Sequence, residues 1–175
     1  MKLKKQHAIK IIFFFVASVS LVCIIWTIIP CNRATVLWKR GYQDKAILLW
    51  KNEISHKNDR ASYQKIVEAY IGLAMYNEAE MFTQKALTYY PNCVNFYFYQ
   101  AMVDFYKGRY NQSFVNTEKV ISMNEYFPEV YLLRGMIMEK LNNPKQAKYE
   151  FIKEVNNNPG NRLAWAKLHG LQNED

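Results

Sequence analysis

The sequence of 175 residues has few of the residues and motifs that enzymes use. Its three histidines, His7, His56 and His169, lie far apart and in no metal-ligand spacing. It contains no glycine-rich phosphate loop, no HExxH motif and no nucleophile elbow. We therefore expect a protein that is not an enzyme, with no catalytic residues, no cofactor and no metal.

Cysteine is also scarce. Cys23, Cys31 and Cys93 form an odd set without CxxC spacing, which argues against a disulfide scaffold or a zinc site. A bridge between Cys31 and Cys93 stays open if this part of the chain faces an oxidising compartment. We favour three ordinary thiols.

Acidic residues are absent from the first 30 positions, which hold Lys2, Lys4, Lys5 and Lys10. Setting these four lysines aside leaves 19 basic and 15 acidic residues, so half of the net charge of +8 lies in this arm. No motif combines basic and aromatic residues as nucleic-acid-binding segments do. We expect an ordinary mixed-charge surface and no nucleic acid partner.

The longest apolar run covers residues 11–29, with no charged side chain over 19 positions. At about 1.5 Å per residue a helix of this length spans roughly 28 Å, close to the thickness of a bilayer. Trp26 suits the membrane interface, and Pro30 ends the run. The sequence therefore predicts a basic arm at residues 1–10 and a transmembrane signal anchor at residues 11–30, with membrane contact through 11–29.

A cleaved secretory signal is the alternative, with a small-residue site at Ser18 and Ser20. Cleavage there leaves an apolar new N-terminus, so we favour the uncleaved anchor. A lipoprotein site is disfavoured because Pro30 precedes Cys31, where a small residue is expected.

The orientation of the anchor is less constrained by sequence. Four basic residues precede the run, and four follow it closely: Arg33, Lys39, Arg40 and Lys45. The short arm with its free amine favours a cytoplasmic N-terminus. We therefore expect a single-pass membrane protein with the repeats described next on the non-cytoplasmic side.

The most informative stretch is residues 128–161, which reads as two amphipathic helices joined by a polar turn. Gly135 and Ala147 are small where the helices approach, Phe151 points between them, and Pro159 ends the second helix. Moving back by 34 residues places Ala101, Ser113, Thr117 and Glu125 at these positions, and a further 34 places Val67, Ala79, Thr83 and Pro91 there.

A helix pair that recurs at this period resembles the tetratricopeptide repeat (TPR) family. The resemblance implies an all-α fold, a right-handed α-solenoid of helix hairpins that follows the N-terminal transmembrane helix. Trp165 takes the position of Tyr63, Tyr97 and Tyr131, which extends the register. The predicted units are a degenerate N-terminal repeat at 31–59, repeats at 60–93, 94–127 and 128–161, and a capping helix with its tail at 162–175.

Two charged residues depart from the repeat pattern. Asp104 and Arg134 stand where members of the family usually place apolar side chains. Because the leading helices of neighbouring repeats lie side by side, we expect these two residues to form an ion pair.

The resemblance further implies a concave groove, lined by the leading helices, that receives a peptide or a partner helix. Some family members bind an acidic C-terminus there with Lys, Arg and Asn, but this sequence offers Gln64, Glu68, Tyr99 and Glu129, which disfavours such a ligand. The middle of the groove is aromatic and thioether-rich, which suits either an apolar partner segment or ordinary packing between helices. The predicted partner-binding residues are Gln64, Glu68, Phe98, Met102, Phe105, Tyr106, Leu132, Met136 and Glu139, and the wider groove adds Ala61, Ile71, Asn95, Glu129 and Lys140.

These features together predict a non-catalytic protein–protein interaction scaffold or assembly factor of a membrane-associated complex. A permanent structural subunit of a large membrane complex and a receptor for translocated peptides are the alternatives. The partner is a protein or peptide in each case, and the sequence does not set the oligomeric state.

Overall fold

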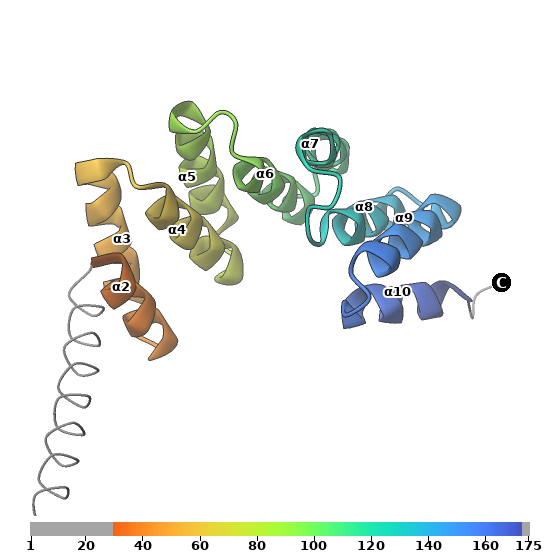
Figure 1. Cartoon of the computed structure of the whole chain (residues 1–175), viewed down its shortest axis with the longest axis horizontal. Coiled ribbons are helices and arrows are strands. Elements are labelled where there is room, and N and C mark those ends of the chain that lie inside the picture. The colour runs from red at the N-terminus through yellow and green to blue at the C-terminus, as the bar shows by residue number, and fades with distance from the viewer. Residues whose placement is uncertain (1–29, 173–175) are drawn as a thin grey trace, which may run out of the picture. The chain divides into compact units, whose positions relative to one another are not determined.

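A computed structural model describes the backbone of residues 30–172 (Figure 1). Over this range the chain is helical and contains no strand. The predicted basic arm, nearly all of the predicted anchor and residues 173–175 lie outside the described residues. Within residues 30–172 no helix combines the length and the apolar character needed to cross a bilayer.

The chain forms two compact units, Met1–Ser62 and Tyr63–Asp175, which are described separately. Each predicted repeat contains two helices. The helices are α2 (Pro30–Lys39), α3 (Gln43–Lys57), α4 (Arg60–Gly72), α5 (Tyr76–Tyr89), α6 (Val94–Tyr106), α7 (Tyr110–Met123), α8 (Val130–Lys140), α9 (Pro144–Asn157) and α10 (Arg162–Gln172).

In the first unit, α2 and α3 form one hairpin. Gly41 has the left-handed φ of 82° that ends α2, as expected for a turn at this glycine. Trp50 and Ile54 of α3 are buried, and the Trp50 ring lies 5.8 Å from that of Trp38 on α2. The apolar face of the short first repeat is therefore formed largely by tryptophan.

In the second unit, the hairpins share one turn conformation at a spacing of 34 residues. Ala74, Gly108 and Asn142 all have left-handed φ, at 56°, 76° and 56°. The residue after each donates its N–H to a carbonyl five residues earlier, which closes the helix end. These bonds are Met75 to Tyr70 at 2.8 Å, Arg109 to Asp104 at 2.8 Å and Asn143 to Met138 at 2.9 Å. The period in the sequence is thus a period in backbone conformation.

The small residues lie at the helix contacts, as predicted. A Cβ added at Gly135 would overlap the ring of Phe151, which is fully buried. Ala101 and Ser113 are also fully buried, and the Ser113 hydroxyl donates to the Ala101 carbonyl at 2.7 Å. Each hairpin therefore closes where one helix gives up side-chain volume to the other.

The aromatic register extends to α10. The Tyr97 hydroxyl donates to the Pro91 carbonyl at 3.0 Å, and the Trp165 indole donates to the Pro159 carbonyl at 3.0 Å. The two bonds lie at equivalent positions two repeats apart. The prediction that Trp165 continues the position of Tyr97 is confirmed.

The predicted ion pair between Asp104 and Arg134 is wrong. The Asp104 carboxylate binds Arg109, which begins the next helix, and accepts from Asn116 of α7 at 2.8 Å. The guanidinium of Arg134 lies 3.4 Å from Glu150 of α9 and 4.3 Å from the ring centroid of Phe114. Each charge finds its partner within its own hairpin, where the second helix is nearer than the next leading helix.

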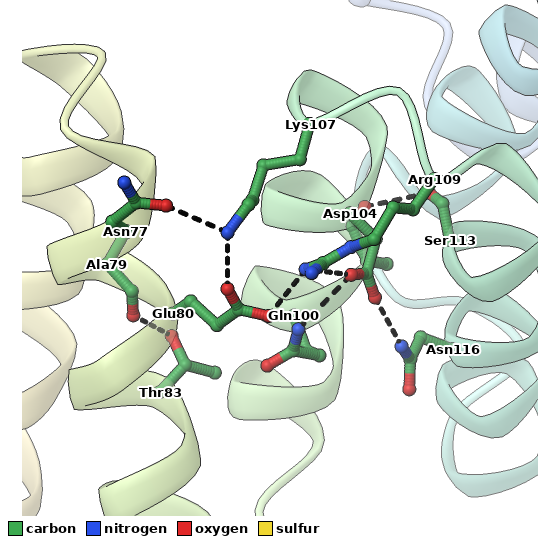
Figure 2. A network of polar contacts seen from close by, with 11 residues as sticks. Asn77, Ala79, Glu80, Thr83, Gln100, Asp104, Lys107, Arg109, Ser113 and Asn116 are labelled. Atoms are coloured by element: carbon green, nitrogen blue, oxygen red, sulfur yellow. Dashed lines mark hydrogen bonds and ion pairs between the residues drawn. The ribbon is translucent and has the colours of Figure 1, made fainter.

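A polar network links α5 to the hairpin of α6 and α7 (Figure 2). Figure 2 shows the Arg109 guanidinium between Glu80 and Asp104, with ion pairs to both. Lys107 donates to Glu80 at 2.6 Å and to Asn77 at 2.8 Å. Burial opposes ionisation of Glu80, but the hydrogen bonds from Lys107 and Arg109 prevail and lower its pKa. The network fixes one hairpin against the next.

Candidate partner-binding pocket

The second unit carries a hollow of about 190 Å³ formed by α6, α8 and the start of α10. Its floor is almost fully buried, because Phe98, Phe105 and Leu132 are each 7–8% exposed. Its rim is open to solvent at Tyr106 and Leu163, which are 46% and 51% exposed. The lining residues are Phe98, Met102, Phe105, Tyr106, Glu129, Leu132, Leu133, Met136, Asn161 and Leu163.

Most of the predicted groove residues come together here. Phe98, Met102, Phe105 and Tyr106 from α6 face Leu132 and Met136 from α8, and Glu129 of the wider groove also lines the hollow. The two alternatives for this apolar stripe both apply in part. The floor packs as core, with the Phe98 ring 5.0 Å from that of Phe127, whereas the rim and the two half-buried methionines remain accessible.

The other predicted site residues lie elsewhere. Gln64 and Glu68 are on α4, where Glu68 accepts from the Tyr99 hydroxyl at 2.6 Å and pairs with Lys65 at 2.7 Å. Burial, together with this bond to Glu68, raises the pKa of Tyr99. Glu139, at the end of α8, binds Lys167 of α10 at 2.6 Å. These acids stabilise contacts between helices and do not line the hollow.

Three lining residues, Leu133, Asn161 and Leu163, were absent from the sequence prediction. Leu163 follows Glu129 by one full period, so the register places it in the groove although it was assigned to the capping helix. Asn161 lies one period after Phe127, outside any leading helix, and no sequence signal separates it from an ordinary cap.

A buried carboxylate behind the hollow holds two of its walls. Glu154 of α9 is 1% exposed and accepts from the backbone N–H of Leu132 at 3.4 Å. It also accepts from the side-chain amide of Asn161 at 2.9 Å, and the Asn161 carbonyl oxygen in turn caps α10 at the N–H of Ala164. Glu154 thus satisfies an N–H in the first turn of α8, where a negative charge is favourable, and positions the start of α10.

Glu129 occupies an unusual place at the rim. It is the residue before α8, yet its side chain makes no capping bond, and its φ of 64° is left-handed. That conformation costs a residue with a Cβ roughly 1–2 kcal/mol. The Glu129 side chain is exposed and, among the described residues, its carboxylate has no hydrogen bond or ion pair. The cap that it could supply comes from Glu154.

The described residues contain no group of three His, Cys, Asp or Glu side chains placed to hold a metal ion. Cys93 is a half-buried free thiol. Its proposed partner Cys31 has a side chain outside the described residues, so the disulfide alternative stays untested. The hollow is accordingly lined for contact with another molecule, through apolar surface and a single carboxylate.

The architecture of these hairpins is the TPR fold, whose stacked repeats form extended binding surfaces in other proteins. No family model matches the sequence, and no curated protein matches it. Solved structures do. MamA residues 41 to the end from Desulfovibrio magneticus RS-1 is 19% identical with a TM-score of 0.70, and the match covers 82% of this chain and 81% of that one.

Two further structures support the same fold. TTC0263, a thermophilic TPR protein of Thermus thermophilus, is 15% identical with a TM-score of 0.69, over 83% of this chain and 80% of its own. The first TPR of Spaghetti (RPAP3), bound to the HSP90 peptide SRMEEVD, is 16% identical with a TM-score of 0.61, over 67% of this chain and 93% of its own. At these identities the similarity concerns the fold.

Proposed function

We propose that this protein is a non-catalytic interaction scaffold that binds a segment of a partner polypeptide in the hollow between α6, α8 and α10. The observation that carries the proposal is the combination of a buried aromatic floor, two half-buried methionines and an exposed apolar rim. Aromatic and methionine side chains are typical of surfaces that bury a partner's apolar residue.

The size of the hollow supports a side-chain ligand. Its volume of about 190 Å³ is below the roughly 300–1,000 Å³ of ordinary small-molecule pockets, so it suits one large side chain of a longer segment. The similarly folded RPAP3 domain, whose structure contains a peptide, supports a polypeptide ligand.

The proposal includes a membrane context. The uncharged run at residues 11–29, with its basic flank, supports a single-pass anchor with a cytoplasmic N-terminus and the repeats on the other side. In that setting the scaffold acts as an assembly factor of a membrane-associated complex.

The experiment is affinity selection of a displayed random peptide library on the full chain in detergent micelles. We expect selected peptides to lose at least tenfold in affinity for the Met102→Glu variant, because a carboxylate would be placed against their apolar anchor. Met81→Glu is the matched control, since Met81 is 56% exposed on α5 and does not line the hollow. Circular dichroism checks that both variants fold. If no selected peptide depends on Met102, the proposal is wrong.

A permanent structural subunit is a second candidate, favoured by a repeated exposed apolar position on the second helix of each hairpin. Leu48, Met81, Val115 and Tyr149 follow one another at intervals of 33 or 34 residues and are 52–66% exposed. Such a subunit would aggregate when prepared alone in detergent, and substituting these residues with Ser would restore a monodisperse elution profile. An assembly factor would be monodisperse without the substitutions.

A further inference from the structure

We infer that the hollow selects a partner segment that carries a positive charge next to its large apolar side chain, and that Glu129 binds this charge. The cation would be a lysine, an arginine or a free N-terminal amine. The inference rests on the proposed function and adds the chemistry of the partner.

The first step concerns the charge of the lining. Glu129 is the one charged residue among the ten that line the hollow. The other polar groups are the Tyr106 hydroxyl and the Asn161 amide, and the amide already donates to Glu154. A partner therefore meets apolar walls with one negative charge at their edge.

The second step concerns the availability of that charge. A glutamate before a helix would normally be expected to interact with the first N–H groups of that helix. Here the N–H of Leu132 bonds instead to Glu154, which approaches from α9. The Glu129 carboxylate consequently remains exposed and without a partner among the described residues.

The third step concerns the backbone. Glu129 keeps a left-handed φ of 64°, which glycine adopts without strain. A strained residue that bears an unpaired charge at the edge of an apolar hollow is a feature of ligand-binding sites. The strain has no structural return within the described residues, because the side chain makes no bond there.

The charge also sets the polarity of recognition. The peptide in the RPAP3 structure, SRMEEVD, is acidic at its C-terminal end. No lysine or arginine lines the present hollow, so an acidic segment would face Glu129 without a compensating donor. A basic segment makes the favourable pair.

The test applies the same peptide selection to the wild type, Glu129→Gln, Glu129→Lys and Glu118→Gln. Glu118 is exposed on α7 and does not line the hollow, so it is the matched control. We expect wild-type pools to be enriched in a large apolar residue adjacent to Lys or Arg. An exposed ion pair of up to about 1 kcal/mol corresponds to roughly a fivefold loss for Glu129→Gln, and none for Glu118→Gln. Glu129→Lys should select acidic neighbours instead.

The outcomes separate the two proposals. Peptides that need Met102 but show no basic preference, or that bind Glu129→Gln as tightly as wild type, overturn the inference and leave the proposed function standing. If no peptide depends on Met102, the proposed function and this inference fail together. A fivefold loss that disappears in high salt, where exposed charges are screened, supports the inference.

Discussion

The hairpins α6–α7 and α8–α9 place opposite charges on their leading helices, and each neutralises its own. In α6–α7, Asp104 is held by Arg109 and Asn116. In α8–α9, Arg134 makes one contact of 3.4 Å with Glu150, and the second Glu150 oxygen has no hydrogen-bond partner. The first arrangement is densely bonded and partly open to solvent, whereas the second is buried and loosely bonded.

Both arrangements reach back to the same register position of the preceding hairpin. Arg109 pairs with Glu80 of α5, and Arg134 lies over the ring of Phe114 on α7, one period later. A guanidinium can therefore join neighbouring repeats through an ion pair or through a cation–π contact. The repeat thus keeps the place of the contact and leaves its chemistry free to change.

The largest effect is expected where the buried pair is broken. Glu150→Ala should lower the free energy of unfolding by about 3 kcal/mol, because Arg134, whose side chain is 14% exposed, loses its partner. Urea denaturation of the full chain in detergent measures it. Asp104→Ala should cost less, since Arg109 is 34% exposed and keeps Glu80. Replacing Arg134 and Glu150 together by Leu should cost less than Glu150→Ala alone, and simple additivity would contradict this account.

The next effect distinguishes how the two hairpins close. Gly135 faces Phe151, and the equivalent pair in α6–α7 is Ala101 with Thr117. Gly135→Ala should cost about 1–3 kcal/mol, because its Cβ would overlap the buried ring. The penalty should shrink in a Phe151→Leu background, measured by a double-mutant cycle. Gly72→Ala, where nothing lies within 4 Å of the added Cβ, is the control that should not destabilise.

A smaller effect is expected at the shared turn position. Ala74→Gly should stabilise by up to about 1 kcal/mol, because glycine adopts the left-handed φ without steric cost. Gly108→Ala should destabilise by a similar amount, since its φ of 76° would become strained. Thermal unfolding of the two variants should therefore shift in opposite directions, and shifts of the same sign would contradict the common turn geometry.

The smallest effect concerns pH. The pKa of Glu80 is lowered in the folded state, so its ion pairs stabilise the protein above the unfolded pKa of about 4.5. That contribution is lost as the pH falls through the lower, folded value. Glu80→Gln should flatten the loss of stability on acidification below about pH 4.5, measured by urea midpoints over a pH series. An unchanged slope would show that Glu80 titrates alike in both states.

The sequence predicts the framework because period, turns and small residues are local properties. Gly135, Ala147 and the turn at Gly108 announce the helix contacts through size and backbone freedom alone. The walls of the hollow follow from the same register, since equivalent positions share a face. Leu163 shows the limit of applying the register unevenly: its position was available by counting and was overlooked.

The electrostatic partners could not be obtained in this way. The register says which helices are neighbours, but a long side chain can turn to the second helix of its own hairpin, as Arg134 does towards Glu150. Glu150 and Glu154 look like residues of a solvated helix face, yet both are 1% exposed. Their burial depends on partners that approach from α8 and the α10 cap, contacts that exist only after the hairpins assemble.

Glu154 gives the hollow a property that its lining does not reveal. One oxygen serves α8 and the other serves Asn161 at the start of α10. Separating these walls would strand an anion in a dry interior, which is unfavourable. An incoming segment should consequently find its receptacle already shaped, and its capture should show a single concentration-dependent phase without a slow opening step.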